Sequence, residues 1–163
     1  MRKVAVARCA FVVLTLSTLA ASGADQVVTI KEAEFEITFP EKWKVIKDAK
    51  TPVFFTAKSS DSSVEAGVDN QGSKNFKTLK DFVDFKFGDK KNEIVSNIET
   101  KVGERDALKV TREFAGFLVV ENYCFVAGTC VYCIWFQMTK ADSKKNAKDI
   151  DAIVKSFKLI EAK

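Results

Sequence analysis

Hydrophobic and polar residues alternate along several short stretches of the chain, which is the pattern of half-buried strands. The first stretch runs from Phe35 to Phe39 and ends at Pro40, because proline cannot donate a hydrogen bond to a neighbouring strand. The polar segment 59–63 separates two further alternating stretches and predicts a hairpin between them, whereas the polar segment 69–77 predicts a loop. In this first half, the further strands are predicted at residues 43–46, 53–57 and 64–68.

Two segments have the spacing of amphipathic helices. Thr78 and Asp81 match a capping box at the start of the first, and Gly88 is placed to end it. Its apolar face is formed by Leu79, Phe82, Val83 and Phe87. The second helix is predicted over residues 143–157, with Asp142 or Ser143 as its N-cap. Its apolar face is predicted to hold Ala147, Ile150, Val154 and Phe157.

Longer strands are predicted in the second half of the chain, at 94–102 and 108–114. Two nearly continuous apolar runs follow, at 117–126 and 130–138, and such runs are typical of central strands that are covered on both faces. Strands outnumber helices and the connections between them are short. We therefore expect an α+β fold with an antiparallel β-sheet flanked by helices, as a single domain over residues 25–163.

The first 24 residues have the pattern of an export signal. Arg2, Lys3 and Arg8 precede an apolar stretch, and the small residues Ser22-Gly23-Ala24 predict cleavage after residue 24. The apolar stretch is too short to span a bilayer stably. We therefore expect an exported protein, located in a periplasm or outside the cell, with a thylakoid lumen as a further possibility; the alternative is that the segment stays in place as an anchor.

Removal of residues 1–24 would leave 23 basic and 22 acidic residues, so the rest of the chain is nearly neutral. Without a basic stripe, we expect no nucleic-acid partner. The sequence contains no histidine, which excludes Ser-His-Asp and Cys-His nucleophile systems and His-containing zinc sites. We expect a protein that is not an enzyme and has no cofactor or metal.

Acidic residues and tryptophans were weighed as further binding candidates. Asp61, Glu65 and Asp69 lie near one hairpin, but their spacing matches no calcium loop, so we interpret them as a solvated hairpin face. Trp43 and Trp135 are interpreted as core residues and not as platforms for a ligand.

Three cysteines lie beyond the signal segment, at positions 124, 130 and 133. Cys130 and Cys133 match C-x-x-C, which would suit a thiol–disulfide oxidoreductase at a helix N-terminus, but the flanking residues favour a strand. In a strand these two side chains would point to opposite faces. A two-residue turn at Gly128-Thr129 instead places Cys124 opposite Cys133 in a non-hydrogen-bonded pair, which predicts a Cys124–Cys133 disulfide. Three reduced, buried cysteines are the alternative.

The order of these elements resembles the PsbP-like superfamily, which includes DcrB-like proteins. A strand that ends in proline shortly before a tryptophan, a capped helix, a glycine turn, a glycine-centred hairpin and a closing helix all occur in the family's order. The segments that carry the resemblance are Phe35 to Trp43, Thr78 to Phe82, Val102-Gly103 to Ala107, Phe125 to Thr129 with Tyr132 and Phe136, and Ile153 to Lys158. The resemblance implies an α/β/α sandwich around an antiparallel sheet.

Known members of this superfamily include the PsbP subunit of photosystem II, periplasmic DcrB-type proteins, secretion-effector chaperones and a nuclear Ran-binding relative, and most are binding or assembly proteins. The resemblance therefore implies an exported, non-enzymatic binding or assembly factor that acts on an envelope or membrane-complex protein, and we expect it to be a monomer. Two alternatives remain: a thiol–disulfide active protein that uses Cys130 and Cys133, and a carrier of a small molecule or lipid.

Overall fold

The computed structural model describes residues 24–30, 34–46, 53–72, 76–127 and 130–160. The predicted signal segment, apart from Ala24, lies outside the described residues, as does the predicted turn at Gly128-Thr129. Neither helix in the described ranges is both long and apolar enough to cross a membrane.

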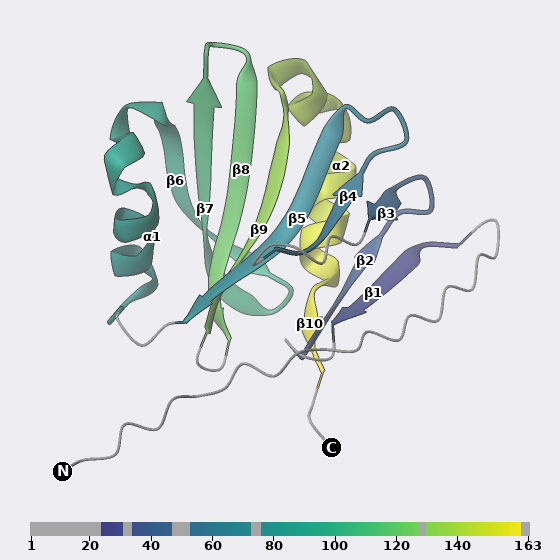
Figure 1. The fold of residues 1–163 in the computed structure, drawn as a ribbon, viewed down its shortest axis with the longest axis horizontal. Coiled ribbons are helices and arrows are strands. Elements are labelled where there is room, and N and C mark those ends of the chain that lie inside the picture. Colours follow the sequence, from purple (N-terminus) through teal and green to yellow (C-terminus); the bar gives the residue numbers. More distant parts are fainter. Residues whose placement is uncertain (1–23, 31–33, 47–52, 73–75, 128–129, 161–163) are drawn as a thin grey trace.

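Seven strands form the main sheet, and all of its neighbouring strands are antiparallel (Figure 1). Their order across the sheet is β3-β4-β5-β9-β8-β7-β6. In chain order they are β3 (Lys44–Ile46), β4 (Val53–Lys58), β5 (Val64–Gly72), β6 (Ile94–Val102), β7 (Arg105–Phe114), β8 (Leu118–Ala127) and β9 (Cys130–Thr139). The two strands that the sequence predicts to be central, β8 and β9, are side by side within the sheet and are largely buried.

A second, three-stranded sheet consists of β1 (Gln26–Ile30), β2 (Phe35–Phe39) and β10 (Lys158–Leu159), in the order β1-β2-β10. The sequence pattern predicts β2 but neither of its partners, and it indicates one sheet where the structure has two. β1 pairs along its whole length with β2, and its Val28 and Ile30 are buried in the common core while Val27 is exposed. β10, the last strand in chain order, pairs with β2, where Leu159 lies opposite Phe35.

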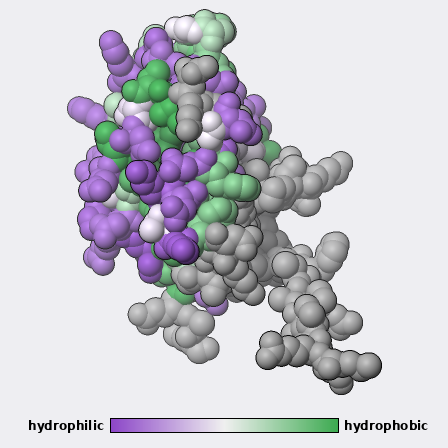
Figure 2. All heavy atoms as spheres, turned by 90° about the vertical axis from the view of Figure 1, so that its left-hand side faces the viewer, coloured by the Kyte–Doolittle hydropathy of each residue, from purple (hydrophilic) through white to green (hydrophobic). Residues whose placement is uncertain are grey.

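The two helices lie on opposite faces of the main sheet, which confirms the predicted antiparallel sheet flanked by helices. Helix α2 (Lys140–Ser156) and the small sheet cover one face and enclose the larger core with Phe35, Phe125 and Phe157. Helix α1 (Leu79–Phe87) lies on the other face over a smaller apolar cluster. Figure 2 views the side that carries α1 and β6, where hydrophobic residues form separate patches among hydrophilic ones.

The predicted capping box of α1 is present, with Thr78 accepting from the Asp81 backbone and Asp81 accepting from the Thr78 backbone. α1 ends at Phe87 with Gly88 as its C-cap, as predicted; the φ of Gly88 is −57°, and a 3₁₀ helix, η3 (Gly88–Glu93), follows directly. η3 brings Glu93 back to the sheet beside Arg112, which matters for the site described below.

Helix α2 begins three residues before the predicted start. Its N-cap is Thr139, whose hydroxyl accepts from the backbone of Asp142, so neither Asp142 nor Ser143 caps the helix. The buried face also differs from the predicted one: Ala147 is exposed, whereas Asn146 is buried with Ile150, Ile153 and Val154.

The predicted loop at 69–77 is wrong in its first part, since β5 continues to Gly72. Its whole length is paired with β9, from Val64 opposite Met138 to Gly72 opposite Cys130. A polar sequence remains a strand here because β5 lies between β4 and β9, and backbone pairing to a long neighbour overrides the weak strand preference of its residues. This extension places Asp69 on the sheet.

Candidate functional site: the Arg112 pocket

Helix α1 covers only part of its face of the main sheet. Beneath the helix lie Val110, Cys124, Val131 and Cys133, which form the smaller apolar cluster with α1 residues. Further along the same strands, beyond the helix, the sheet carries a pocket of about 530 Å³. This Arg112 pocket is lined by Lys86, Phe87, Arg112, Asn122, Trp135 and Gln137, together with apolar residues of β7 and β8.

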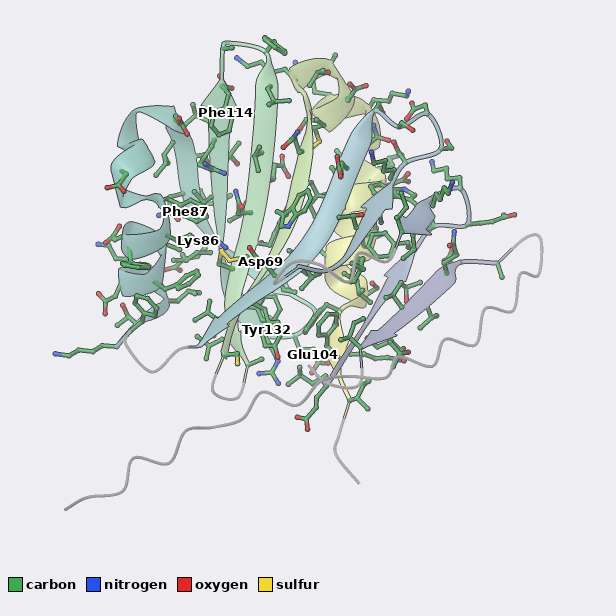
Figure 3. The ribbon with its side chains drawn as sticks, viewed as in Figure 1. Asp69, Lys86, Phe87, Glu104, Phe114 and Tyr132 are labelled. Carbon is green, nitrogen blue, oxygen red and sulfur yellow. A yellow bond between two sulfur atoms is a disulfide. The ribbon has the colours of Figure 1, made fainter. Side chains whose placement is uncertain are left out.

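Three elements place the charged and aromatic side chains that Figure 3 labels around this pocket. Lys86 and Phe87 come from the last turn of α1, Asp69 from β5 and Phe114 from the end of β7. A volume of this size is within the range of small-molecule and peptide side-chain sites.

Arg112 is the central charged residue of the pocket and is only 9% exposed. Its guanidinium carbon lies 5.0 Å from the ring centre of Phe87 and 4.9 Å from that of Phe114, so two aromatic rings flank the cation. Burial lowers the pKa of Arg112, and the Glu93 carboxylate partly opposes this shift. The guanidinium remains charged at neutral pH, as arginine does throughout folded proteins.

Two guanidinium nitrogens of Arg112, Nη1 and Nε, have no hydrogen-bond partner, and both are closed off from solvent. Nη1 lies 3.5 Å from Glu93 Oε2, close enough for an ion pair, but the two atoms make no hydrogen bond. Nε is buried without a hydrogen-bond partner as well. Buried polar groups are nearly always hydrogen-bonded in folded proteins, so this arginine, which also lines the pocket, is the strongest candidate for a binding residue at this site.

Lys86 and Asp69 form the side wall of the pocket. Lys86 Nζ donates to both Asp69 carboxylate oxygens, at 3.1 and 2.9 Å, and both side chains are partly buried. The pair ties α1 to β5 and neutralises the charge of Lys86. Asp69 therefore does not belong to a solvated hairpin face as predicted, because the extension of β5 carries it into this wall.

Trp135 forms part of the floor and is only half-buried, so the prediction that it is a core residue is wrong. It faces Gly67 in the register of β5 and β9, and Gly67 has no side chain that would push the indole away from the sheet. Trp43, by contrast, is 2% exposed and packs against Phe39, as predicted.

The acidic residues that were considered for a cation site are not brought together. Asp61 binds Lys145, Glu65 pairs with Lys58, and Asp69 pairs with Lys86. Among the residues that the structure describes, no group of three or more cysteine and carboxylate side chains is arranged to hold a metal ion.

The cysteines follow the predicted hairpin register. Cys124 lies opposite Cys133, with Cα atoms 4.2 Å apart, and their sulfur atoms are joined as a disulfide. This bond is buried under α1, whereas Cys130 is a free thiol that packs against the larger core on the opposite face. The structure therefore does not bring Cys130 and Cys133 together, and it places neither at a helix N-terminus.

A second pocket of about 540 Å³ lies on the α2 face and contains Glu121, a buried carboxylate. Glu121 accepts from Tyr123 Oη at 3.0 Å and from Ser143 Oγ at 3.3 Å, and it pairs with Lys109 at 2.9 Å. Burial and Glu121 raise the pKa of the Tyr123 phenol above its ordinary value. Because this carboxylate already has three partners, we interpret the network as structural, and the Arg112 pocket as the better candidate site.

The sequence does not predict the Arg112 pocket: Asp69 and Trp135 are interpreted there as a solvated face and a core residue, and Arg112 is not singled out. Arg112 lies among alternating charged residues in a predicted strand, where arginine is normally exposed. The one available signal was the run 108–114, in which Arg112 falls in phase with the apolar residues Leu108, Val110 and Phe114, and not with the polar ones.

No protein-family profile matches this sequence, and no curated protein matches it either. Comparison with solved structures does find similar proteins. A cyanobacterial PsbP from Synechocystis, CyanoP, matches with a TM-score of 0.64 and 10% identity, over 90% of this chain and 98% of CyanoP.

Two further solved structures are similar. The Ran-binding protein Mog1p of Saccharomyces cerevisiae has a TM-score of 0.59 and 10% identity, over 85% of this chain and 96% of Mog1p. LpqN, described as involved in cell envelope biogenesis of Mycobacterium tuberculosis, has a TM-score of 0.50 and 10% identity, over 88% of each chain. Identities this low establish the fold alone. The chain therefore has the fold shared by PsbP-like and Mog1-like proteins, as its sequence predicted.

Proposed function

We propose that this chain is an exported, non-enzymatic binding protein that uses the Arg112 pocket to bind a protein of the cell envelope or of a membrane complex. The observation that carries this proposal is Arg112, a buried cation that lines the pocket beside two aromatic rings and faces Glu93 at 3.5 Å without a hydrogen bond. Buried charges in folded proteins are normally paired and hydrogen-bonded, and a ligand at the pocket would add a partner for this cation.

Support for a binding role also comes from the composition of the pocket. Aromatic and aliphatic surfaces from Phe114, Leu118 and Trp135 surround a few polar groups, which is the composition of recognition sites. Export is supported by the signal pattern of residues 1–24, and an envelope partner by the likeness to LpqN.

Affinity capture tests this proposal. The tagged protein would be crosslinked in the envelope of its own host, purified and analysed by mass spectrometry, beside an Arg112→Met variant and a variant without residues 1–24. We expect one reproducible envelope or membrane-complex protein with the wild type, and its loss with both variants. Equal recovery with Arg112→Met would show that the partner binds outside the Arg112 pocket. No enrichment over the variant without residues 1–24 would contradict the proposal.

A carrier of a small molecule is the second candidate function, favoured by the volume of about 530 Å³. Native mass spectrometry of the protein purified from its host tests it: a retained mass that disappears in Arg112→Met supports a carrier, and a single apo mass contradicts it.

A further inference from the structure

Strand β6 forms one edge of the main sheet (Figure 1). Among the described strands it pairs with β7 alone, and it has nine residues, whereas β3 at the other edge has three. In an antiparallel ladder, every second residue of an edge strand directs its N–H and C=O groups away from its neighbour. β6 therefore presents a row of backbone donors and acceptors, and another extended backbone is the group that matches such a row.

The middle of β6 lacks the features that normally protect an edge strand from further pairing, which are shortness, proline, a bulge or an unpaired lysine. The bulge of this strand lies at its start, between Ile94 and Ser96, and the pairing with β7 is regular from Ser96 onward. The strand contains no proline. Its one basic residue, Lys101, is held at 2.5 Å by its register partner Asp106.

An apolar side chain of β6 is also left uncovered. Residues 97–99 are all exposed, and Ile98 is 53% exposed. Ile98 lines the second pocket, to which α2 contributes the apolar residues Ala147, Ile150 and Val154. The buried carboxylate of this pocket already has its partners, so the uncovered part is apolar. A hydrophobic side chain laid against Ile98 would remove it from water.

The opposite face of the same part of β6 carries an open negative charge. Neighbouring residues of a strand point to opposite faces, so Glu99 lies on the face away from Ile98. Within the described part of the chain, Glu99 is exposed and makes no ion pair. A basic side chain on an added strand would supply one, because opposite charges on neighbouring strands attract each other.

From these observations we propose that β6 binds an extended segment of another protein as an additional strand of the main sheet. The segment pairs with the backbone of β6 at residues 96–101. One apolar side chain of the segment lies against Ile98 at the second pocket, and the adjacent residue is basic and faces Glu99. This inference goes beyond the proposed function and does not depend on it, because no residue of β6 lines the Arg112 pocket.

Selection from a displayed library of random dodecapeptides tests this inference. The full chain purified from its host is the target, and the Ile98→Arg variant removes peptides that bind elsewhere. We expect enriched peptides that have no proline in their centre and that carry an apolar residue next to a basic one. A library that yields no peptide specific for the wild type would overturn the inference.

Titration of a synthesised enriched peptide identifies the surface that binds it. Ile98→Arg should weaken binding about tenfold or more, because it replaces the apolar contact with a charge. Ile46→Arg is the matched control, since Ile46 is an exposed isoleucine on β3, at the other edge of the same sheet, and it should bind as the wild type does. Equal loss in both variants, or in neither, would overturn the inference.

Backbone methylation distinguishes strand addition from binding through side chains alone. Two versions of the peptide carry N-methyl groups at alternate residues, in opposite phase. One version should lose about tenfold or more in affinity and the other should keep it, because only one edge of the added strand faces β6. Amide hydrogen exchange should slow at alternate residues of β6. Equal affinity of the two methylated peptides, or protection confined to other strands, would overturn the inference whether or not the Ile98→Arg variant folds.

Sedimentation of the purified protein tests whether a second copy of the chain is the added strand. We expect a monomer for the wild type and for Ile98→Arg. A wild-type dimer that Ile98→Arg dissociates would assign the edge to a second copy and overturn the inference.

Discussion

The indole ring of Trp135 lies so close to the backbone of Gly67 that a Cβ atom at Gly67 would stand 2.5 Å from Cζ2 and 2.7 Å from Cε2 of the ring. The two residues are register partners in β5 and β9. The floor of the Arg112 pocket therefore depends on a residue that has no side chain, and the position of the indole is a direct consequence of this glycine.

A Gly67→Ala substitution should displace the indole and disturb the pocket. Forcing an extra methyl into a packed position costs about 1–3 kcal/mol, and we expect a loss of stability in that range. Urea unfolding and tryptophan fluorescence measure the two effects. Gly88→Ala is the matched control, since nothing lies within 4 Å of its Cβ position and its φ is −57°; it should leave stability unchanged or slightly raised. Wild-type stability and fluorescence in Gly67→Ala would contradict this account of the floor.

The Cys124–Cys133 bond should form in the exported protein and should stabilise it. The two cysteines are nine positions apart, and closing a loop of this size contributes about 2–4 kcal/mol. Peptide mapping without reductant should recover the linked pair, and the Cys124→Ala/Cys133→Ala double variant should lose stability in that range. Cys130→Ala, on the other face, should lose less. Alkylation of both Cys124 and Cys133 in the unreduced, denatured protein would show that the bond is absent.

The capping box of α1 should stabilise this helix, which carries Lys86 and Phe87 of the pocket. Replacing Thr78 with alanine removes the hydroxyl that accepts from the Asp81 backbone, at a cost of about 1 kcal/mol. Hydrogen exchange should show faster opening of α1 than in the wild type, and Lys77→Ala, at the preceding exposed position, serves as control. Equal exchange rates in Thr78→Ala and Lys77→Ala would exclude a role for the cap.

Asp61 should make the stability depend on pH. Hydrogen bonds from Lys145 and then Ser63 hold the pKa of this carboxylate well below its ordinary value of 3.8. A group whose pKa is depressed on folding stabilises the protein above its unfolded pKa and loses that contribution as the pH falls through the folded pKa. The stability difference between wild type and Asp61→Asn should therefore be constant from pH 7 to 5 and shrink below about pH 4.

Acid unfolding curves of the two proteins measure this difference, with Asp84→Asn, an exposed position on α1, as control. The effect should be small, because both partners of the Asp61–Lys145 pair are exposed. A stability difference between wild type and Asp61→Asn that increases as the pH falls would contradict this prediction.

Alternation and turn chemistry were enough to predict most of the main sheet and the start of α1. The strands around Val64, Val110 and Phe125 follow periodic patterns, and the Thr78 cap is a local signal that needs no tertiary context. The register of Cys124 with Cys133 also followed from counting outward from one turn.

Features that depend on distant partners could not be predicted. β1 and β10 become strands because β2 lies between them, and β5 runs on to Gly72 because β9 pairs with it. The Arg112 pocket depends on how far α1 extends over the sheet and on η3, which returns Glu93 to Arg112. No local pattern in the sequence encodes those distances, so the buried Arg112 was not singled out and the half-buried Trp135 was assigned to the core.

Site-specific photocrosslinking tests the central claim most directly. A photoreactive amino acid at Gln137, in the pocket, is compared with one at Ala152, an exposed position on α2. In the living host, the account predicts a crosslink from position 137 to an envelope or membrane-complex protein, lost when Arg112→Met is added, and no such product from position 152. An identical product from both positions, or none from 137 while 152 captures a partner, would contradict the Arg112 pocket as the binding surface.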